Sequence, residues 1–233
     1  PTRMAYLISI GSTVCGTTAI MATAPVIKAN KSEVSYAIAN ITLFGILSML
    51  IYPYFANFYF DGSSLFVGLF LGTSIHETSQ VAAAGLIYDQ QFNSPETLNI
   101  ATVTKLIRNT FLVIMIPLFA FLYNRNNAKE QNYSIIKIFP YFVLGFVGMI
   151  IFRNLGDQAF LNSGNEIWLS TVENIKLFSK IFLTMAMAAI GLSTNLNDIK
   201  KMGYKPFMVG FIGMATVGII SILTIEFYIY YLF

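Results

Sequence analysis

Long, nearly uninterrupted apolar runs dominate this chain and restrict the folds open to it. Lipid offers no hydrogen-bond partners, so a segment inside a bilayer must satisfy its own backbone groups, as an α-helix does. About twenty apolar residues in a helix cross the hydrocarbon core. Seven segments approach or exceed that length, and they cover residues 3–27, 33–59, 65–88, 97–123, 135–152, 168–192 and 206–233. The sequence predicts an all-α, polytopic helical membrane protein with about seven transmembrane segments.

The charge content supports a membrane environment and argues against other classes. The chain is 56% hydrophobic and 11% charged, whereas soluble domains carry about 25% charged residues. A soluble protein of this size could not bury so much apolar surface, so the lipid bilayer is the expected partner. The net charge is only +3, and without a basic cluster it gives no reason to expect a nucleic-acid partner. The single cysteine, Cys15, cannot form an internal disulfide.

Short connections join the apolar segments, and they contain turn residues such as Gly62 and Pro95. Because no long linker separates the segments, we expect one transmembrane domain over residues 1–233. Residue 1 is proline, and an apolar helix is already under way at Met4. We therefore also expect that the full-length protein has further N-terminal helices.

A group of polar residues interrupts the third apolar segment, residues 65–88. If this segment is one helix, spacings of three and four residues place Thr73, His76, Glu77 and Gln80 on one face. Ionisable groups at bilayer depth are costly, and they usually face a protein interior, a cavity or a partner charge. Histidine titrates near neutral pH. We expect His76, Glu77 and Gln80 to face the helix bundle and to carry a coupling proton.

A structural role is the alternative for this polar group, in which its members join two helices. Gly68 and Gly72 form a G-x-x-x-G pattern, which permits close approach of a second helix. The run from His76 to Gln80 reads H-E-x-x-Q, one residue from a zinc-binding H-E-x-x-H motif. Glutamine is a poor zinc ligand and the chain has no second histidine. We therefore expect no metal site, no other cofactor and no enzymatic activity.

Two cations, Lys105 and Arg108, lie three residues apart on one face of the fourth segment. Arg108 is near the middle of residues 97–123, so its side chain has difficulty reaching a membrane surface. Two cations at this depth need carboxylates or an anionic ligand. The first reading makes Lys105 and Arg108 ligands of an anionic substrate, and the alternative is a salt bridge to Glu77.

Two short polar runs resemble each other, and the first of them predicts a break in an apolar helix. Inside the first segment, a Gly-Thr-Thr run weakens the helix, and we expect it to break between Cys15 and Thr18. The stretch that begins at Gly72 echoes the one that begins at Gly16. A broken helix at membrane depth is tolerated where it lines a cavity or is buried in protein, and half-helix ends often hold ions in transporters. The residues predicted to bind substrate at the two runs are Cys15, Gly16, Thr17, Thr18, Gly72, Thr73 and Ser74.

Three stretches in order resemble the UPF0324 or YeiH-like family of bacterial membrane proteins. They are residues 15–28 (CGTTAIMATAPVIK), 72–85 (GTSIHETSQVAAAG) and 184–196 (TMAMAAIGLSTNL). Members are longer at the N-terminus and carry a sulfate-exporter label, so the resemblance implies a multi-pass protein of the bacterial inner membrane and a sulfate-like substrate. The resemblance also assigns to the shared pattern Cys15, Gly16, His76, Glu77, Gln80, Lys105 and Arg108.

Three functions are compatible with these observations. The first is a secondary transporter of a small anion such as sulfate, in which Lys105 and Arg108 bind the anion and His76 and Glu77 handle a proton. The second is a cation/proton exchanger in which Glu77 binds the cation. The third is a membrane scaffold whose polar groups serve only helix packing. The sequence leaves self-association into homo-oligomers open.

Overall fold

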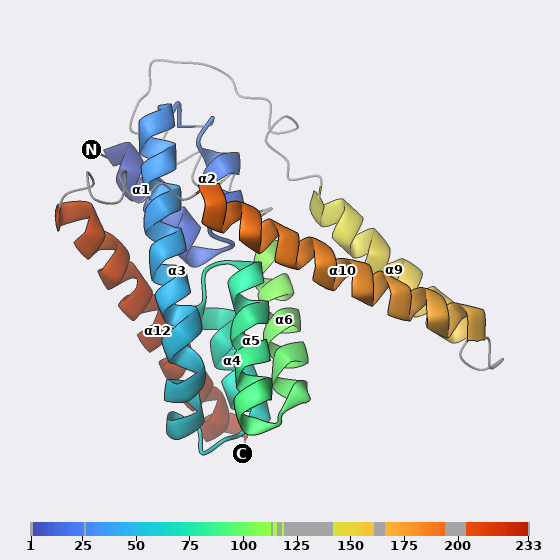
Figure 1. Ribbon diagram of the computed structural model, residues 1–233. Coiled ribbons are helices and arrows are strands. Elements are labelled where there is room, and N and C mark those ends of the chain that lie inside the picture. Colours follow the sequence, from blue (N-terminus) through green and yellow to red (C-terminus); the bar gives the residue numbers. More distant parts are fainter. Residues whose placement is uncertain are drawn as a thin grey trace. The chain divides into compact units, whose positions relative to one another are not determined.

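The computed structural model describes residues 2–25, 27–112, 114–115, 118, 142–160, 166–193 and 204–232. Every regular element within these ranges is a helix (Figure 1), which confirms the all-α prediction. The chain divides into two compact units, Pro1–Ile138 with Asn195–Phe233 and Phe139–Thr194.

The first unit contains the two helix breaks and most of the buried residues. Its helices are α1 (Thr2–Thr13), α2 (Thr17–Thr23), α3 (Lys31–Tyr59), α4 (Ser64–Ser74), α5 (Thr78–Phe92), α6 (Pro95–Thr110) and α12 (Tyr204–Leu232). Local chemistry sets several helix ends. Asn30 and Glu33 form a reciprocal capping box at the start of α3. Asn93 ends α5 in the left-handed conformation, with φ of 54°, and Pro95 occupies the first turn of α6.

Two described helices are long and apolar enough to cross a membrane. They are α3, with a mean hydropathy of 1.9 over its most apolar window, and residues Phe207–Tyr231 of α12, with 2.2. The predicted count of seven spans is not confirmed. One reason is that the first and third apolar segments are each divided into two shorter helices. Another is that residues 119–141, which hold parts of the fourth and fifth segments, lie outside the described residues.

The prediction that the third segment is one helix with its polar residues on a single face is wrong, because this segment is broken. Helix α4 ends at Ser74 and α5 begins at Thr78. Ile75 and Glu77 are extended, with ψ of 143° and 144°. The hydroxyls of Thr73 and Ser74 donate to the carbonyls of Leu69 and Phe70, at 2.6 and 2.5 Å. Such bonds offer the backbone an alternative partner and weaken the helix.

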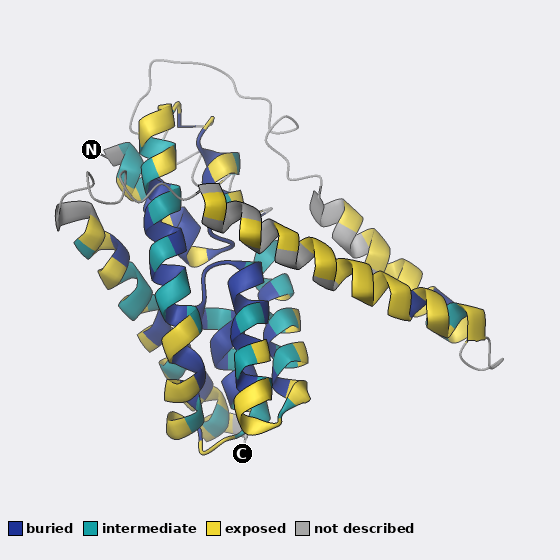
Figure 2. Ribbon diagram, in the orientation of Figure 1, coloured by how far each residue is buried: buried dark blue, intermediate teal, exposed yellow. Residues whose placement is uncertain are grey.

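Close packing of α6 against α4 and α5 depends on small residues. A Cβ atom at Gly68 would lie 2.7 Å from Ile100 Cβ, and one at Gly72 would lie 2.6 Å from the Ala101 carbonyl oxygen. The close helix approach predicted from the G-x-x-x-G pattern is therefore confirmed. Aromatic and aliphatic side chains fill the adjoining core, among them Tyr52, Phe70, Leu71, Tyr88 and Ile225. Figure 2 shows the buried residues gathered where α3, α4 and α5 face one another.

The second unit is a pair of helices, α9 (Phe142–Phe160) and α10 (Glu166–Ser193). Trp168 at the start of α10 lies over Gly156 of α9. Its indole nitrogen donates to Asp157 at 2.9 Å, and Arg153 donates to the same carboxylate at 2.7 Å. Residues 184–193 of the third resembling stretch lie in α10, and 194–196 lie outside the described residues.

Candidate functional site

The two helix breaks in the first unit lie against each other. The predicted break in the first segment is confirmed, because α1 ends at Thr13 and α2 begins at Thr17. Gly16 has φ of 61°, a left-handed conformation that favours glycine. A Cβ atom on Gly16 would lie 2.6 Å from Glu77 Cγ in the second break. Gly16 thus permits both the turn and the close contact of the two breaks.

Lys105 of α6 joins the two breaks through their main chains. Its Nζ donates to the carbonyls of Val14 at 2.7 Å, Ile75 at 2.9 Å and His76 at 2.5 Å. The side chain is fully buried. An ammonium group has three donors, so these carbonyls use all of them. Lys105 therefore replaces the backbone donors that the ends of α1 and α4 lack.

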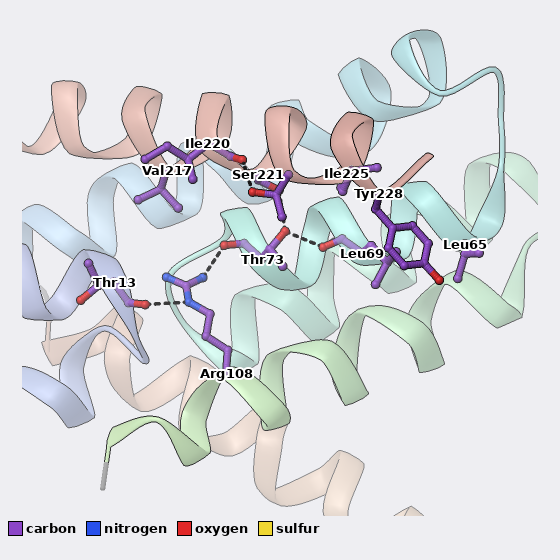
Figure 3. Close-up of a pocket in the computed structure, with 11 residues that line it drawn as sticks. Thr13, Leu65, Leu69, Thr73, Arg108, Val217, Ile220, Ser221, Ile225 and Tyr228 are labelled. Atoms are coloured by element: carbon purple, nitrogen blue, oxygen red, sulfur yellow. Dashed lines mark hydrogen bonds between the residues drawn. The ribbon is translucent and has the colours of Figure 1, made fainter. Parts of the chain in front are cut away.

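Arg108, one turn further along α6, also binds the C-terminal carbonyls of both half-helices. Its Nε donates to Thr13 at 2.8 Å, and Nη2 donates to Ser12 at 2.5 Å. Its Nη1 donates to Thr73 at 2.6 Å and to Ile75 at 3.2 Å. Figure 3 shows the guanidinium between Thr13 and Thr73. These four bonds leave one of the five N–H donors of the side chain without an acceptor among the described residues.

Glu77 lies at the opposite ends of the breaks, where α2 and α5 begin. Its Oε1 accepts hydrogen bonds from the Thr17 backbone N–H at 3.0 Å and from the Thr17 hydroxyl, and Glu77 itself is the N-cap residue of α5. In the part of the chain that the structure describes, Glu77 forms no ion pair with Lys105 or Arg108. The carboxylate thus faces two helix N-termini instead of the two cations.

The charges at the crossing do not balance. A helix C-terminus carries about −0.5 of an elementary charge and an N-terminus about +0.5. Glu77 is therefore roughly neutralised by the two N-termini it faces. Lys105 and Arg108 together carry two positive charges, and the ends of α1 and α4 offset about one of them. About one positive charge remains on the side where Arg108 lies.

Arg108 opens onto a cavity of about 600 Å³ between α1, α4, α6 and α12. Thr13 and Arg108 lie at one end of this pocket, and Leu65 and Tyr228 lie at the other (Figure 3). The hydroxyls of Thr73 and Ser221 meet at 2.5 Å across it. The remaining lining residues are mostly aliphatic, namely Leu69, Val217, Ile220 and Ile225, together with Thr224. The pocket therefore has a polar, cationic end and apolar walls.

Several buried polar atoms near the breaks have no hydrogen-bond partner among the described residues. They include both ring nitrogens of His76, Oε2 of Glu77, the Ser12 hydroxyl and Oδ1 of Asn109. The His76 side chain is fully buried, and Glu77 is 5% exposed. Unpaired buried polar atoms are uncommon, because each loses its hydration without compensation. These atoms could bind a proton, a water molecule or a small ion.

The structure places the residues predicted from sequence in three groups. His76, Glu77 and Gln80 are buried in the protein interior, as expected. Of the three, the His76 main chain contacts Lys105 of α6, whereas the Glu77 carboxylate bonds to Thr17 and the Gln80 amide bonds to Thr42 of α3. Thr73 and Arg108 line the pocket. The other predicted residues do not line the pocket. At the first break, Cys15 is buried, Gly16 and Thr17 contact Glu77, and Thr18 is exposed. On α4 and α6, Gly72 packs on Ala101, Ser74 bonds to Phe70, and Lys105 is enclosed by carbonyls.

Sequence reasoning missed Ser12, Thr13 and Ser221. Ser12 and Thr13 act through main-chain carbonyls, which no side-chain pattern reveals. Ser221 is a lone hydroxyl on the apolar helix α12, and its isolation is the signal that could have identified it.

Comparison with known proteins gives consistent matches to one family. A family described as "Conserved hypothetical protein 698" matches residues 1–210. A UPF0324 membrane protein of Fusobacterium nucleatum is 36% identical over 230 residues, which are 95% of this chain and 66% of the relative. One from Streptococcus agalactiae is 39% identical over 207 residues, which are 89% of this chain and 59% of the relative. The chain thus spans about 59–66% of the length of these relatives. No solved structure matches.

Proposed function

The chain belongs to the UPF0324 family of bacterial membrane proteins. With this membrane location as the premise, we propose that it acts as a secondary transporter of a small anion. In this proposal the protein crosses the bacterial plasma membrane several times and moves the anion without changing it chemically. Neither a cofactor nor a catalytic step forms part of the proposal.

The observation that carries the proposal is the uncompensated positive charge beside Arg108. Two broken helices meet at this point, and such breaks form the ion and substrate sites of many secondary transporters. The two cations exceed the charge of the helix ends they cap by about one unit. Arg108 is the cation that faces the pocket, because the three donors of Lys105 are all used by carbonyls. A bound anion would supply the missing charge.

His76 and Glu77 supply a route for coupling the anion to a proton. Both are almost fully buried, and both have atoms without a partner among the described residues. The main-chain carbonyl of His76 binds Lys105, and the carbonyl of the preceding residue, Ile75, binds both cations. A change of charge on either side chain would therefore act on the same main-chain segment that holds the anion-binding end of the pocket.

Anion flux into sealed liposomes that contain the purified protein tests the proposal. We expect Arg108→Gln to reduce flux to background, because the pocket loses its cation. Membrane insertion should persist, since a central arginine costs about 2.5–3.5 kcal/mol on insertion scales. Arg153→Gln is the matched control, because Arg153 is exposed on α9 and pairs only with Asp157 among the described contacts. Wild-type flux in Arg108→Gln would exclude substrate binding by this residue.

The double variant Glu77→Gln/Arg108→Gln separates this proposal from a structural ion pair. If the two charges neutralised each other, removal of both would restore stability and flux. Because Glu77 faces helix N-termini instead, we expect no recovery in the double variant. Recovery of flux would assign both residues to helix packing.

A cation/proton exchanger is the second candidate. It is favoured by Glu77, whose Oε2 has no hydrogen-bond partner and which forms no ion pair with Lys105 or Arg108 in the described residues. A sodium gradient that drives proton movement without any anion requirement would select this function. Absence of any ion flux in the same liposomes would leave the scaffold role.

A further inference from the structure

We propose that the pocket binds an amphiphilic monoanion, with its charged head at Arg108 and an aliphatic tail along α4 and α12. This inference rests on the proposed anion transport and specifies the class of substrate. It follows from three properties of the pocket, which are its charge, its length and the nature of its walls.

The charge of the pocket suits a single negative charge. About one positive charge remains after the helix C-termini are counted, and a dianion such as sulfate would exceed it. One N–H of the Arg108 Nη2 has no acceptor among the described residues. The hydroxyls of Thr73 and Ser221 lie on the adjoining wall. The hydroxyl protons of Thr73 and Ser221 are already used by the Leu69 carbonyl and by the contact between the two hydroxyls. A compact head with one charge, such as a carboxylate or sulfonate, therefore matches the net charge and the remaining N–H of Arg108.

The length of the pocket exceeds what an inorganic oxyanion needs. Along α4 the pocket extends from Leu65 to Thr73, which corresponds to about 12 Å at 1.5 Å per residue. Along α12 it extends from Val217 to Tyr228. Cavities of about 300–1,000 Å³ hold drug-sized organic ligands, and this one measures about 600 Å³. A sulfate ion would occupy only the end near Arg108.

The walls beyond Arg108 favour an apolar tail. Leu69, Ile220 and Ile225 line the middle of the pocket, and Leu65 lies at its far end. The polar hydroxyls of Thr73 and Ser221 are satisfied by each other and by the carbonyl of Leu69, so the middle of the pocket offers few unpaired groups for a second polar head. Burial of each methylene against such walls is worth about 0.8 kcal/mol.

This chemistry could be supplied by a free organic acid or by an anionic lipid, since both present one charge and an aliphatic chain. Alkylsulfonates are suitable probes, because they keep a single charge at any working pH. Binding of methanesulfonate, hexanesulfonate and sulfate would be measured by calorimetry on the full chain in phosphatidylcholine nanodiscs. Empty nanodiscs correct for partition of the probe into lipid.

We expect hexanesulfonate to bind tighter than methanesulfonate by up to about fourfold for each added methylene, and sulfate to bind no tighter than methanesulfonate. Leu69→Trp fills the tail region and should abolish the gain with chain length while methanesulfonate still binds. Leu86→Trp is the matched control, because Leu86 is exposed on α5 and does not line the pocket. Arg108→Gln should weaken all of the probes.

Equal affinities for the two sulfonates, or tighter binding of sulfate, would overturn the proposal. So would a chain-length gain that Leu69→Trp leaves unchanged. If nanodiscs with added phosphatidylglycerol weaken hexanesulfonate binding in the wild type but not in Leu69→Trp, the natural occupant is an anionic lipid. If they do not, it is a free organic anion. Flux in liposomes separates the proposed transport from the proposed substrate class. Binding that depends on the tail, without any flux, contradicts only the transport proposal. Flux without any dependence on the tail contradicts only the amphiphilic substrate.

Discussion

At the scale of single residues, Glu77 should contribute more stability than a carboxylate at one helix end. We expect Glu77→Gln to lower the free energy of unfolding by about 2 kcal/mol or more, because the charged oxygen accepts two hydrogen bonds beside two helix N-termini. Thermal unfolding of the purified protein measures this effect. Glu33→Gln is the control, since Glu33 caps only α3 and its capping bonds are exposed. Equal losses in the two variants would contradict the double role of Glu77.

Residue types predicted which side chains belong to the site but not what they bind. The cost of burying charge correctly indicated that His76, Glu77, Lys105 and Arg108 would cluster in the protein interior. Their partners could not be predicted, because most of them are main-chain carbonyls and a carbonyl is present in every residue. The alternative salt bridge from Glu77 to the cations assumed that opposite charges find each other. Helix ends carry partial charges of both signs and compete with side chains for the same role.

At the scale of helices, the packing of α4 on α6 should tolerate no added methyl group. We expect Gly72→Ala to destabilise the protein by about 1–3 kcal/mol, because the new atom would meet the Ala101 main chain and the Thr104 side chain. Gly145→Ala in α9 is the matched control. No described atom lies within 4 Å of the methyl position there, and alanine favours a helix over glycine. Thermal unfolding of both variants checks this expectation, and similar stability of the two would contradict it.

Helix periodicity and turn residues predicted most elements of the first unit. The start of α3 follows from a capping box, and the start of α6 follows from a proline; both are visible in the sequence. The break between α4 and α5 was only hinted at by the Gly-Thr echo, since the polar residues between Thr73 and Gln80 also fit one face of a continuous helix. That break depends on Lys105 and Arg108, which supply donors for the freed carbonyls from a different helix. Such contacts between distant helices cannot be predicted from the local sequence around the break.

At the scale of the whole molecule, transport requires that water reach the pocket from one side of the membrane. We expect a cysteine at Thr224, which lines the pocket, to react with a membrane-impermeant thiol reagent added to one side of sealed vesicles. Bound hexanesulfonate should slow the reaction. Leu223→Cys is the control, because Leu223 is 63% exposed and does not line the pocket, so lipid should shield it. Cys15 is buried and should give little background. Equal labelling at both positions would contradict an aqueous path.

The use of main-chain carbonyls by Lys105 and Arg108 also affects how such a site can diverge during evolution. Each carbonyl oxygen is independent of the side chain that its residue carries. The buried side chains at positions 14 and 75 can therefore change, within limits of size and polarity, while the carbonyl contacts to α6 persist. The two cations have no such freedom. Among homologues we therefore expect the strongest constraint on the donors in α6 and on the glycine at position 16. The side chains at the acceptor positions should vary among homologues, limited only by size and polarity. An analysis of side-chain covariation would therefore miss the contacts between the acceptor carbonyls and the two cations.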